Sequence, residues 1–211
     1  MATDAAVTRR KLIDEAARAF AADGVFAASL IEITRRAGQR NRGALHYHFG
    51  SRSGILCAVL ERHTDFLARR EGELLDGALA RADHDVEPVV EAIVRPAAEL
   101  AESGWRGRCF LMILSELIEE DPAHLDKEVN AMLERTGGYA VYAVLEERMP
   151  PMADDVRLER LALATGFILR AVADRARALH RRSRRGRAQL DQESFVANLV
   201  HMVAAGLAAP A

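Results

Sequence analysis

The side chains best suited to specific chemistry gather in one short segment near the amino terminus. Arg40, Asn41 and Arg42 stand directly before two small residues, Gly43 and Ala44. Arginine can donate a bidentate pair of hydrogen bonds to guanine, asparagine can pair with adenine, and a small apolar side chain can touch the methyl group of thymine. A helix beginning here could therefore read base edges in the major groove of DNA.

Neighbouring residues extend this pattern. His46 could contact a base or a sugar, and Ser29 could offer its hydroxyl, or the helix that follows it, to a phosphate. His46 and His48 are two positions apart and diverge by about 200° on a helix, so we expect no shared metal site.

The segment needs helices to position it. Apolar residues recur at helical spacing over 8–22, Ser29 is a good N-cap for a short helix over 30–36, and a third helix is expected over 40–48. Gly38 can supply the positive φ of a tight turn between the two short helices. Two short helices joined by a glycine turn, behind a supporting helix, form a helix-turn-helix.

This stretch resembles the DNA-binding domain of the tetracycline-repressor (TetR) family over about residues 8–60. The matching features are Gly24, Phe26, Ser29, Ile33, Ala37-Gly38, Gly43-Ala44-Leu45, His46-Tyr47-His48-Phe49 and Ser51-Arg52. The resemblance implies phosphate contacts from Tyr47, His48 and Arg52. One departure is a turn of four residues, Gln39–Arg42, where the common pattern has three.

The rest of the chain also has a helical pattern, and the expected class is all-α. A DNA-binding domain over 1–52 is expected to precede a ligand-binding and dimerisation domain over 53–211. Glycine and proline breaks divide the second domain into helices over about 53–81, 88–102, 106–120, 123–148, 154–180 and 192–207. The last two helices are expected to pair with those of a second copy.

The resemblance implies that the body encloses a pocket for a small molecule, and no cofactor is expected. The candidate lining residues are Trp105, Cys109, Phe110, Met112, Ile113, Met132, Tyr139, Tyr142, Phe167 and Arg170. Arg170 could pair with an anionic ligand, although a salt bridge on its own helix is the stronger expectation. Gly137-Gly138 should kink the helix expected there or divide it in two.

Charge separates the two expected domains. Residues 1–52 hold nine arginines and lysines against five acids, a balance of +4 that leaves −6 for the remainder of a chain with net charge −2. A basic head on an acidic body is expected when only the head meets a polyanion. The first residues lack a signal-peptide pattern and no run is long enough to span a membrane, so we expect a cytoplasmic location.

These features predict a homodimeric repressor that a small molecule releases from a palindromic operator, with no catalytic or metal site. One alternative keeps the DNA binding but senses thiol oxidation through Cys57 or Cys109. A second alternative is a helical binding protein whose helix-turn-helix is vestigial. The arginine-rich stretch 181–187 could bind nucleic acid, although a solvated connector is the better expectation.

Overall fold

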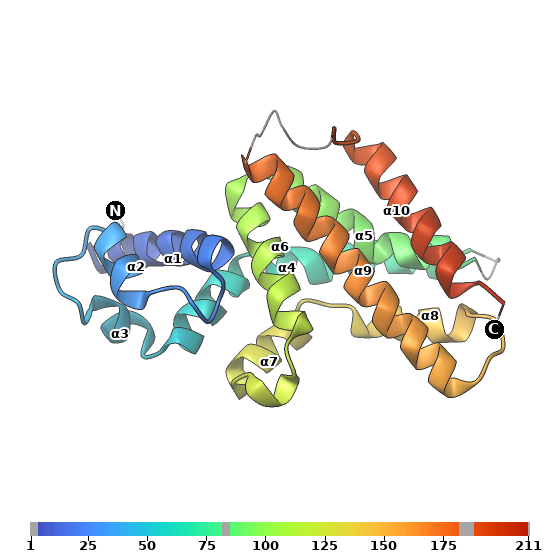
Figure 1. Ribbon diagram of the computed structural model, residues 1–211, viewed down its shortest axis with the longest axis horizontal. Helices are drawn as coiled ribbons and strands as arrows, with labels where there is room; N and C mark the ends of the chain where they lie inside the picture. Colours follow the sequence, from blue (N-terminus) through green and yellow to red (C-terminus); the bar gives the residue numbers. More distant parts are fainter. Residues whose placement is uncertain (1–3, 82–84, 182–187, 211) are drawn as a thin grey trace.

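The computed structural model describes residues 4–81, 85–181 and 188–210, and these residues form helices with short connections and no strand. The expected all-α class is confirmed. Figure 1 shows a small helical unit at one end and a longer helical lobe that contains the rest of the described residues. No helix among the described residues is both long and apolar enough to cross a bilayer.

The small unit contains α1 (Asp4–Asp23), α2 (Leu30–Arg36) and α3 (Ala44–Phe49). Leu12, Phe20, Ile33 and Leu45 are buried and hold the three helices around one core. Ser29 caps α2 as expected, because its hydroxyl accepts the N–H of Glu32 at 3.3 Å.

The start expected for the third helix is wrong: α3 begins at Ala44 and not at Arg40. The physical reason is local competition for the backbone. The side-chain Oδ1 of Asn41 accepts the N–H of Gly43 at 2.9 Å, which forms a turn where helix was expected. The four-residue turn therefore precedes the helix, and Arg40–Gly43 lie outside it.

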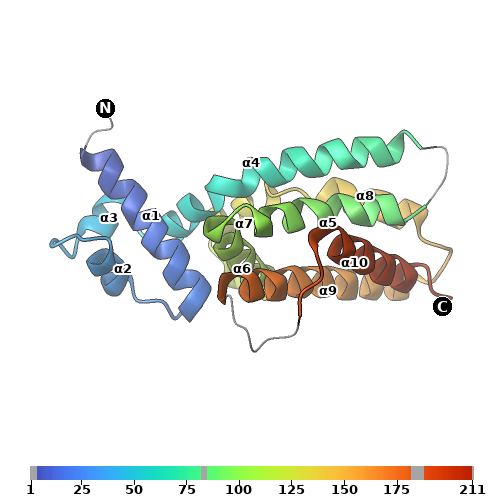
Figure 2. The same cartoon turned by 90° about the horizontal axis from the view of Figure 1, so that it is seen from above.

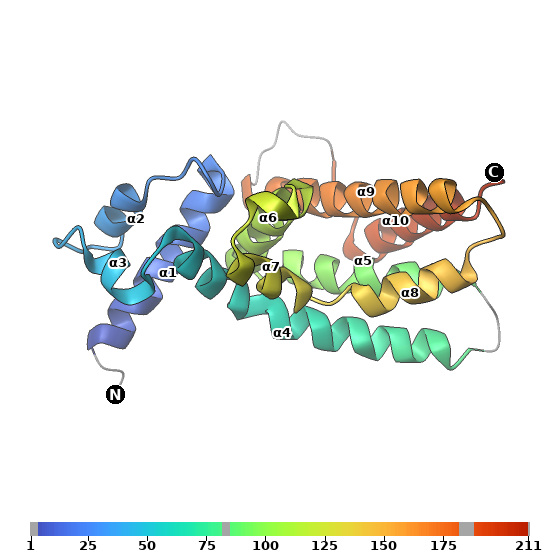
Figure 3. The same cartoon turned by 90° about the horizontal axis from the view of Figure 1, so that it is seen from below.

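The longer lobe is a bundle that starts with the long helix α4, whose first residue, Arg52, falls at the expected domain boundary. Figures 2 and 3 show α4 along one edge of the lobe, α9 and α10 side by side, and α8 between α4 and α9. The helices are α4 (Arg52–Leu79), α5 (Glu87–Glu102), α6 (Trp105–Glu119), α7 (Lys127–Glu134), α8 (Tyr139–Arg148), α9 (Asp154–Arg181) and α10 (Gln192–Leu207), with a 3₁₀ turn over Pro122–His124.

The single helix expected over 123–148 is wrong. A 3₁₀ turn, α7 and α8 occupy this stretch, and α7 and α8 are separated at Gly137 and Gly138. These two glycines have φ values of +99° and +90°, which L side chains rarely adopt. The Gly-Gly pair thus divides two helices, which was one of its two expected effects. The stretch 182–187, which includes most of the expected arginine-rich connector, lies outside the described residues.

Candidate functional site

The end of the small unit presents the polar segment to solvent. Arg40, Arg42 and His46 are exposed, and Tyr47 is 84% exposed on α3. His48 is half-buried, with its ring edge-on to Tyr47 at a centroid distance of 5.2 Å. The exposed face of α3 and the turn before it therefore form a basic and aromatic surface at one tip of the molecule (Figure 1).

Two residues that were expected to contact bases, Asn41 and Ala44, are bonded or buried within the small unit. The Oδ1 of Asn41 accepts the Gly43 N–H, so a bidentate contact with adenine would require breaking this hydrogen bond. Ala44 is only 9% exposed, so its methyl group is poorly placed for a thymine. Gly43 is exposed and leaves room in front of α3.

Arg52, expected to contact a phosphate, instead donates hydrogen bonds within the protein. Its Nη1 donates to the carbonyl of Val25 at 2.7 Å and its Nη2 to the carbonyl of Ala28 at 2.8 Å. These bonds tie the first turn of α4 to the loop between α1 and α2. Ser29, at the end of that loop, is exposed. The structure thus gives Arg52 a positioning role within the small unit.

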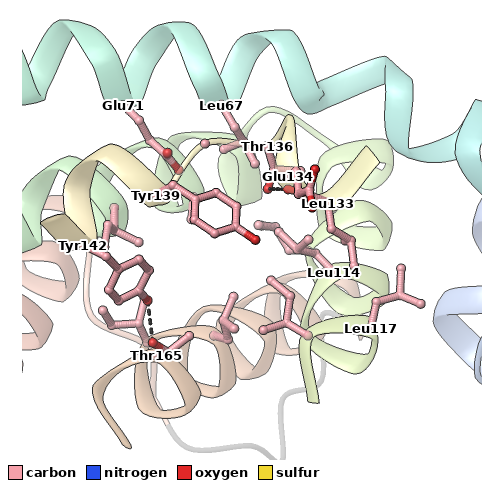
Figure 4. A pocket seen from close by; sticks show the side chains of 18 of the residues that line it. Leu67, Glu71, Leu114, Leu117, Leu133, Glu134, Thr136, Tyr139, Tyr142 and Thr165 are labelled. Carbon is pink, nitrogen blue, oxygen red and sulfur yellow. Dashed lines mark hydrogen bonds between the residues drawn. The ribbon is translucent and has the colours of Figure 1, made fainter. Parts of the chain in front are cut away.

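The longer lobe encloses a second feature, a cavity of about 470 Å³. Figure 4 shows side chains from α4, α6, α8, α9 and the segment around α7 converging on it. The apolar part of the wall comprises Leu67, Ile93, Ala97, Leu111, Leu114, Leu117, Ile118, Pro122, Leu125, Leu133, Ile168, Leu169 and Val172. This composition suits a mostly apolar small molecule.

Of the residues expected to line a ligand pocket, Tyr139 and Tyr142 line this cavity. The other eight lie elsewhere, among them the buried Ile113 and the partly buried Met132. Cys109, Phe110 and Met112 are buried in the core, and Phe167 is exposed on α9. Arg170 is exposed and forms a salt bridge with Asp174 of the same helix at 3.2 Å, which was the stronger of its two expected roles.

Trp105 lies at the junction between the two units. The guanidinium of Arg18, on α1, stacks over its ring at 3.9 Å. Arg106 pairs with Asp14 of α1 at 2.7 Å, and Arg62 of α4 contacts the same carboxylate. Because burial opposes ionisation while these two arginines favour it, the net effect lowers the pKa of Asp14. This cluster binds α1 to α4 and α6.

Helix α6 connects the cavity with the small unit. Leu114 and Leu117 line the cavity, whereas the Oε1 of Glu116 accepts the N–H of Val25 at 2.8 Å. Val25 belongs to the same loop that Arg52 holds. A displacement of α6 by a ligand would therefore reach the loop between α1 and α2 directly.

Polar groups at the cavity are few, and sequence reasoning missed the most unusual one. The hydroxyl of Tyr142 lies 2.5 Å from Oγ1 of Thr165 (Figure 4), whose hydroxyl is also within 2.7 Å of the Leu161 carbonyl. Glu71 is only 8% exposed, and burial raises the pKa of its carboxyl to about 8. The spacing of buried residues on α4 could have revealed it, because Glu71 continues the stripe of Thr64, Leu67 and Leu75.

The two thiols are poorly suited to redox sensing. Cys109 is buried, and burial raises the pKa of its thiol to about 11. Burial, aided by Glu128 and Asp126, also raises the pKa of the Cys57 thiol. Because the thiolate is the reactive form, these environments disfavour the thiol-sensing alternative.

An exposed helix behind a basic turn on a helix-turn-helix unit, joined to a helical body with an apolar cavity, defines the class of DNA-binding regulators that sense a ligand. Residues 91–206 match the family model "Tetracyclin repressor-like, C-terminal domain", and residues 12–59 match "Bacterial regulatory proteins, tetR family". The chain belongs to the TetR family of bacterial regulatory proteins.

The comparison with a curated relative concerns the small unit. The chain is 44% identical over 59 residues to the HTH-type transcriptional regulator SrpR of Pseudomonas putida. The match covers 28% of this chain and 27% of that protein's length. This similarity therefore supports the helix-turn-helix and leaves the body to be compared by its fold.

Solved structures resemble most of the chain, including the body. AibR, solved with isovaleryl coenzyme A and operator DNA, has a TM-score of 0.56 and 18% identity over 92% of this chain and 97% of that one. FadR from Bacillus subtilis, solved with stearoyl-CoA, has a TM-score of 0.53 and 13% identity over 93% and 98% of the two chains. At these identities the similarity shows a common fold.

Proposed function

We propose that this protein is a cytoplasmic transcriptional repressor that binds a palindromic operator as a homodimer and leaves it when a small, mostly apolar molecule fills the cavity. The observation that carries the proposal is the position of α6, which lines the cavity through Leu114 and Leu117 and touches the DNA-binding unit through Glu116. One helix thus serves both sites.

The proposed DNA contacts follow from exposure. Arg40 and Arg42 reach base edges, Gly43 permits close approach, and His46 contacts a base or a sugar. Phosphates are held by Tyr47, His48 and the exposed Ser29. Asn41, Ala44 and Arg52 are left out of this set because the structure uses them within the small unit.

The proposed dimer forms through α9 and α10. Leu163, which is 63% exposed, and Phe167 lie on α9, and Met202 is exposed on α10. Exposed large apolar side chains on neighbouring helices are suited to cover one another in a four-helix interface. Such an interface would hold two α3 helices about 34–36 Å apart, one turn of DNA.

Release is a shift between two states. A ligand that fits the cavity better in a second arrangement of α6 lowers the affinity for operator by its preference for that arrangement, typically about 1–3 kcal/mol. The acyl-CoA ligands of AibR and FadR belong to proteins that share the fold. The ligand proposed for this chain follows from its own cavity wall, which is mostly apolar.

The proposal is tested by selecting binding sites from a randomised pool of DNA duplexes with the purified protein. We expect a palindrome, and Arg42→Ala should lose about 1–3 kcal/mol of affinity per half-site contact together with the preference for one base pair. Arg69→Ala removes one exposed positive charge from α4 and is the matched control. Binding without sequence preference, or equal effects of both variants, would contradict the proposal and favour a vestigial helix-turn-helix.

A further inference from the structure

The charges around the cavity all have one sign. Three glutamates, Glu71, Glu120 and Glu134, are among its lining residues, and the described wall contains no lysine, arginine or histidine. An anionic ligand group would therefore enter without a partner and beside like charges, which is unfavourable in a largely apolar space.

Glu71 is the buried acid of the wall, and no positively charged side chain among the described residues pairs with it. One of its oxygens accepts the backbone N–H of Gly138, but Oε2 is buried without a hydrogen bond. Among the described carboxylates it is the one with a buried, unsatisfied oxygen. Arg70, the next residue along α4, is unavailable because it pairs with Glu73 and Glu99.

The turn beside Glu71 is built to admit its carboxyl group. A Cβ on Gly137 would lie 2.0 Å from Oε2 of Glu71 and would displace this carboxyl, and the φ of +99° at Gly137 itself favours glycine. Figure 4 shows Glu71 reaching from α4 toward the turn that leads into Tyr139. Glu71, Gly137 and Gly138 are all among the lining residues, so this carboxyl group and the glycines that cover it belong to one part of the cavity wall.

Two tyrosines complete the surroundings. Tyr139 is 70% exposed at the rim of the cavity and Tyr142 is half-buried in its wall. Aromatic faces attract cations, especially where water is partly excluded. Acid groups and aromatic rings around an apolar space together favour a positively charged ligand group.

We propose that the cavity binds a molecule with a protonated amine on an apolar body, and that Glu71 is the counter-charge of that amine. The apolar body occupies the leucine-rich wall and the ammonium group donates to Oε2. Binding favours the ionised form of Glu71, so a protonated carboxyl gives up its proton to solvent when the ammonium group arrives. This inference rests on the cavity being the effector site of the proposed function and adds the ligand class.

The experiment is calorimetric titration of the purified full-length protein, without DNA, with three probes of one shape: 4-phenylbutylamine, 4-phenylbutan-1-ol and 4-phenylbutyrate. We expect the amine to bind at least about tenfold more tightly than the alcohol, and the butyrate most weakly. Titration of the amine near pH 7 in buffers of different ionisation enthalpy should show proton release.

Variants locate the effect. Glu71→Gln keeps the shape of the side chain and should reduce amine affinity at least about tenfold, with alcohol affinity nearly unchanged and proton release abolished. Glu134→Gln removes an exposed acid from the same wall and is the matched control, with a change below about threefold.

Equal affinity for amine and alcohol, an unchanged amine affinity in Glu71→Gln, or no binding of the amine would overturn the proposal. Preference for the butyrate would point to an anionic ligand instead. Retained alcohol binding shows that Glu71→Gln is folded. Because these titrations contain no DNA, their failure leaves the result of the operator selection intact.

Discussion

The ionisation of Glu71 should make the folded protein less stable as the pH rises. The carboxyl has a pKa of about 8 in the fold against an ordinary value of 4.5. The folded state therefore binds more protons than the unfolded state between these two values. Stability from this group is fully present below pH 4.5 and is lost as the pH rises through 8.

The size of the effect follows from the two pKa values. Each pH unit between them costs about 1.4 kcal/mol, because the unfolded state releases this proton and the folded state keeps it. The loss of stability is about 3 kcal/mol at pH 7 and about 5 kcal/mol above pH 8, where the carboxyl also ionises in the fold. Glu71→Gln removes the ionisation while preserving shape. Its free energy of unfolding should exceed that of the wild type by an amount that grows by about 4 kcal/mol between pH 5 and pH 8.5.

Urea unfolding followed by circular dichroism at both pH values measures this difference. Protein concentration must be the same throughout, because a dimer unfolds in a concentration-dependent way. Glu134→Gln, at an exposed position of the same cavity, should show little change with pH. If the difference in the free energy of unfolding between wild type and Glu71→Gln stayed constant from pH 5 to pH 8.5, the pKa of Glu71 would not be raised by burial and the reasoning would be refuted.

Three other changes test separate parts of the structure. Gly137→Ala should destabilise the protein by about 1–3 kcal/mol in thermal unfolding, because the φ of +99° and the adjacent Glu71 carboxyl both disfavour a Cβ at this position. Gly77→Ala is the control: this helical glycine has open space around it, so the substitution should stabilise the protein by about 0.5–1 kcal/mol. Replacing both Cys57 and Cys109 by serine should leave oxidant response and operator affinity unchanged, and loss of an oxidant-dependent release from DNA would revive thiol sensing. Leu163→Glu should shift the protein toward monomer in sedimentation and weaken binding to the palindrome; an unchanged dimer would place the interface elsewhere.

Much of the small unit could be predicted because its signals are local. Ser29 is the N-cap of α2, and Gly38 adopts the positive φ of the turn after it. Helix α2 has the bounds that the sequence predicted. The start of α3 was the exception, since the preference of Asn41 for bonding its neighbouring backbone competes with a helix and is hard to weigh from sequence.

The cavity was harder to predict because its wall is assembled from segments far apart in the chain. Helical spacing identifies apolar faces but not which faces meet, so Phe110 and Met112 went to the core while Leu114 and Leu117 reached the cavity. Trp105 also had the composition of a pocket residue and was instead placed at the junction by Arg18.

Glu71 shows most clearly what the sequence could indicate and what only the tertiary structure determined. In the sequence it stands among Arg69, Arg70 and Glu73, a charged run of the kind that is usually exposed, although its spacing from Leu67 and Leu75 places it on the apolar face of the helix. Periodicity indicated an all-helical chain, and the amino-terminal motif together with its basic charge indicated a DNA-binding head. Only tertiary packing decided that one carboxyl of this run would be covered by a glycine turn and left unpaired, because burial depends on the elements that arrive from elsewhere in the chain.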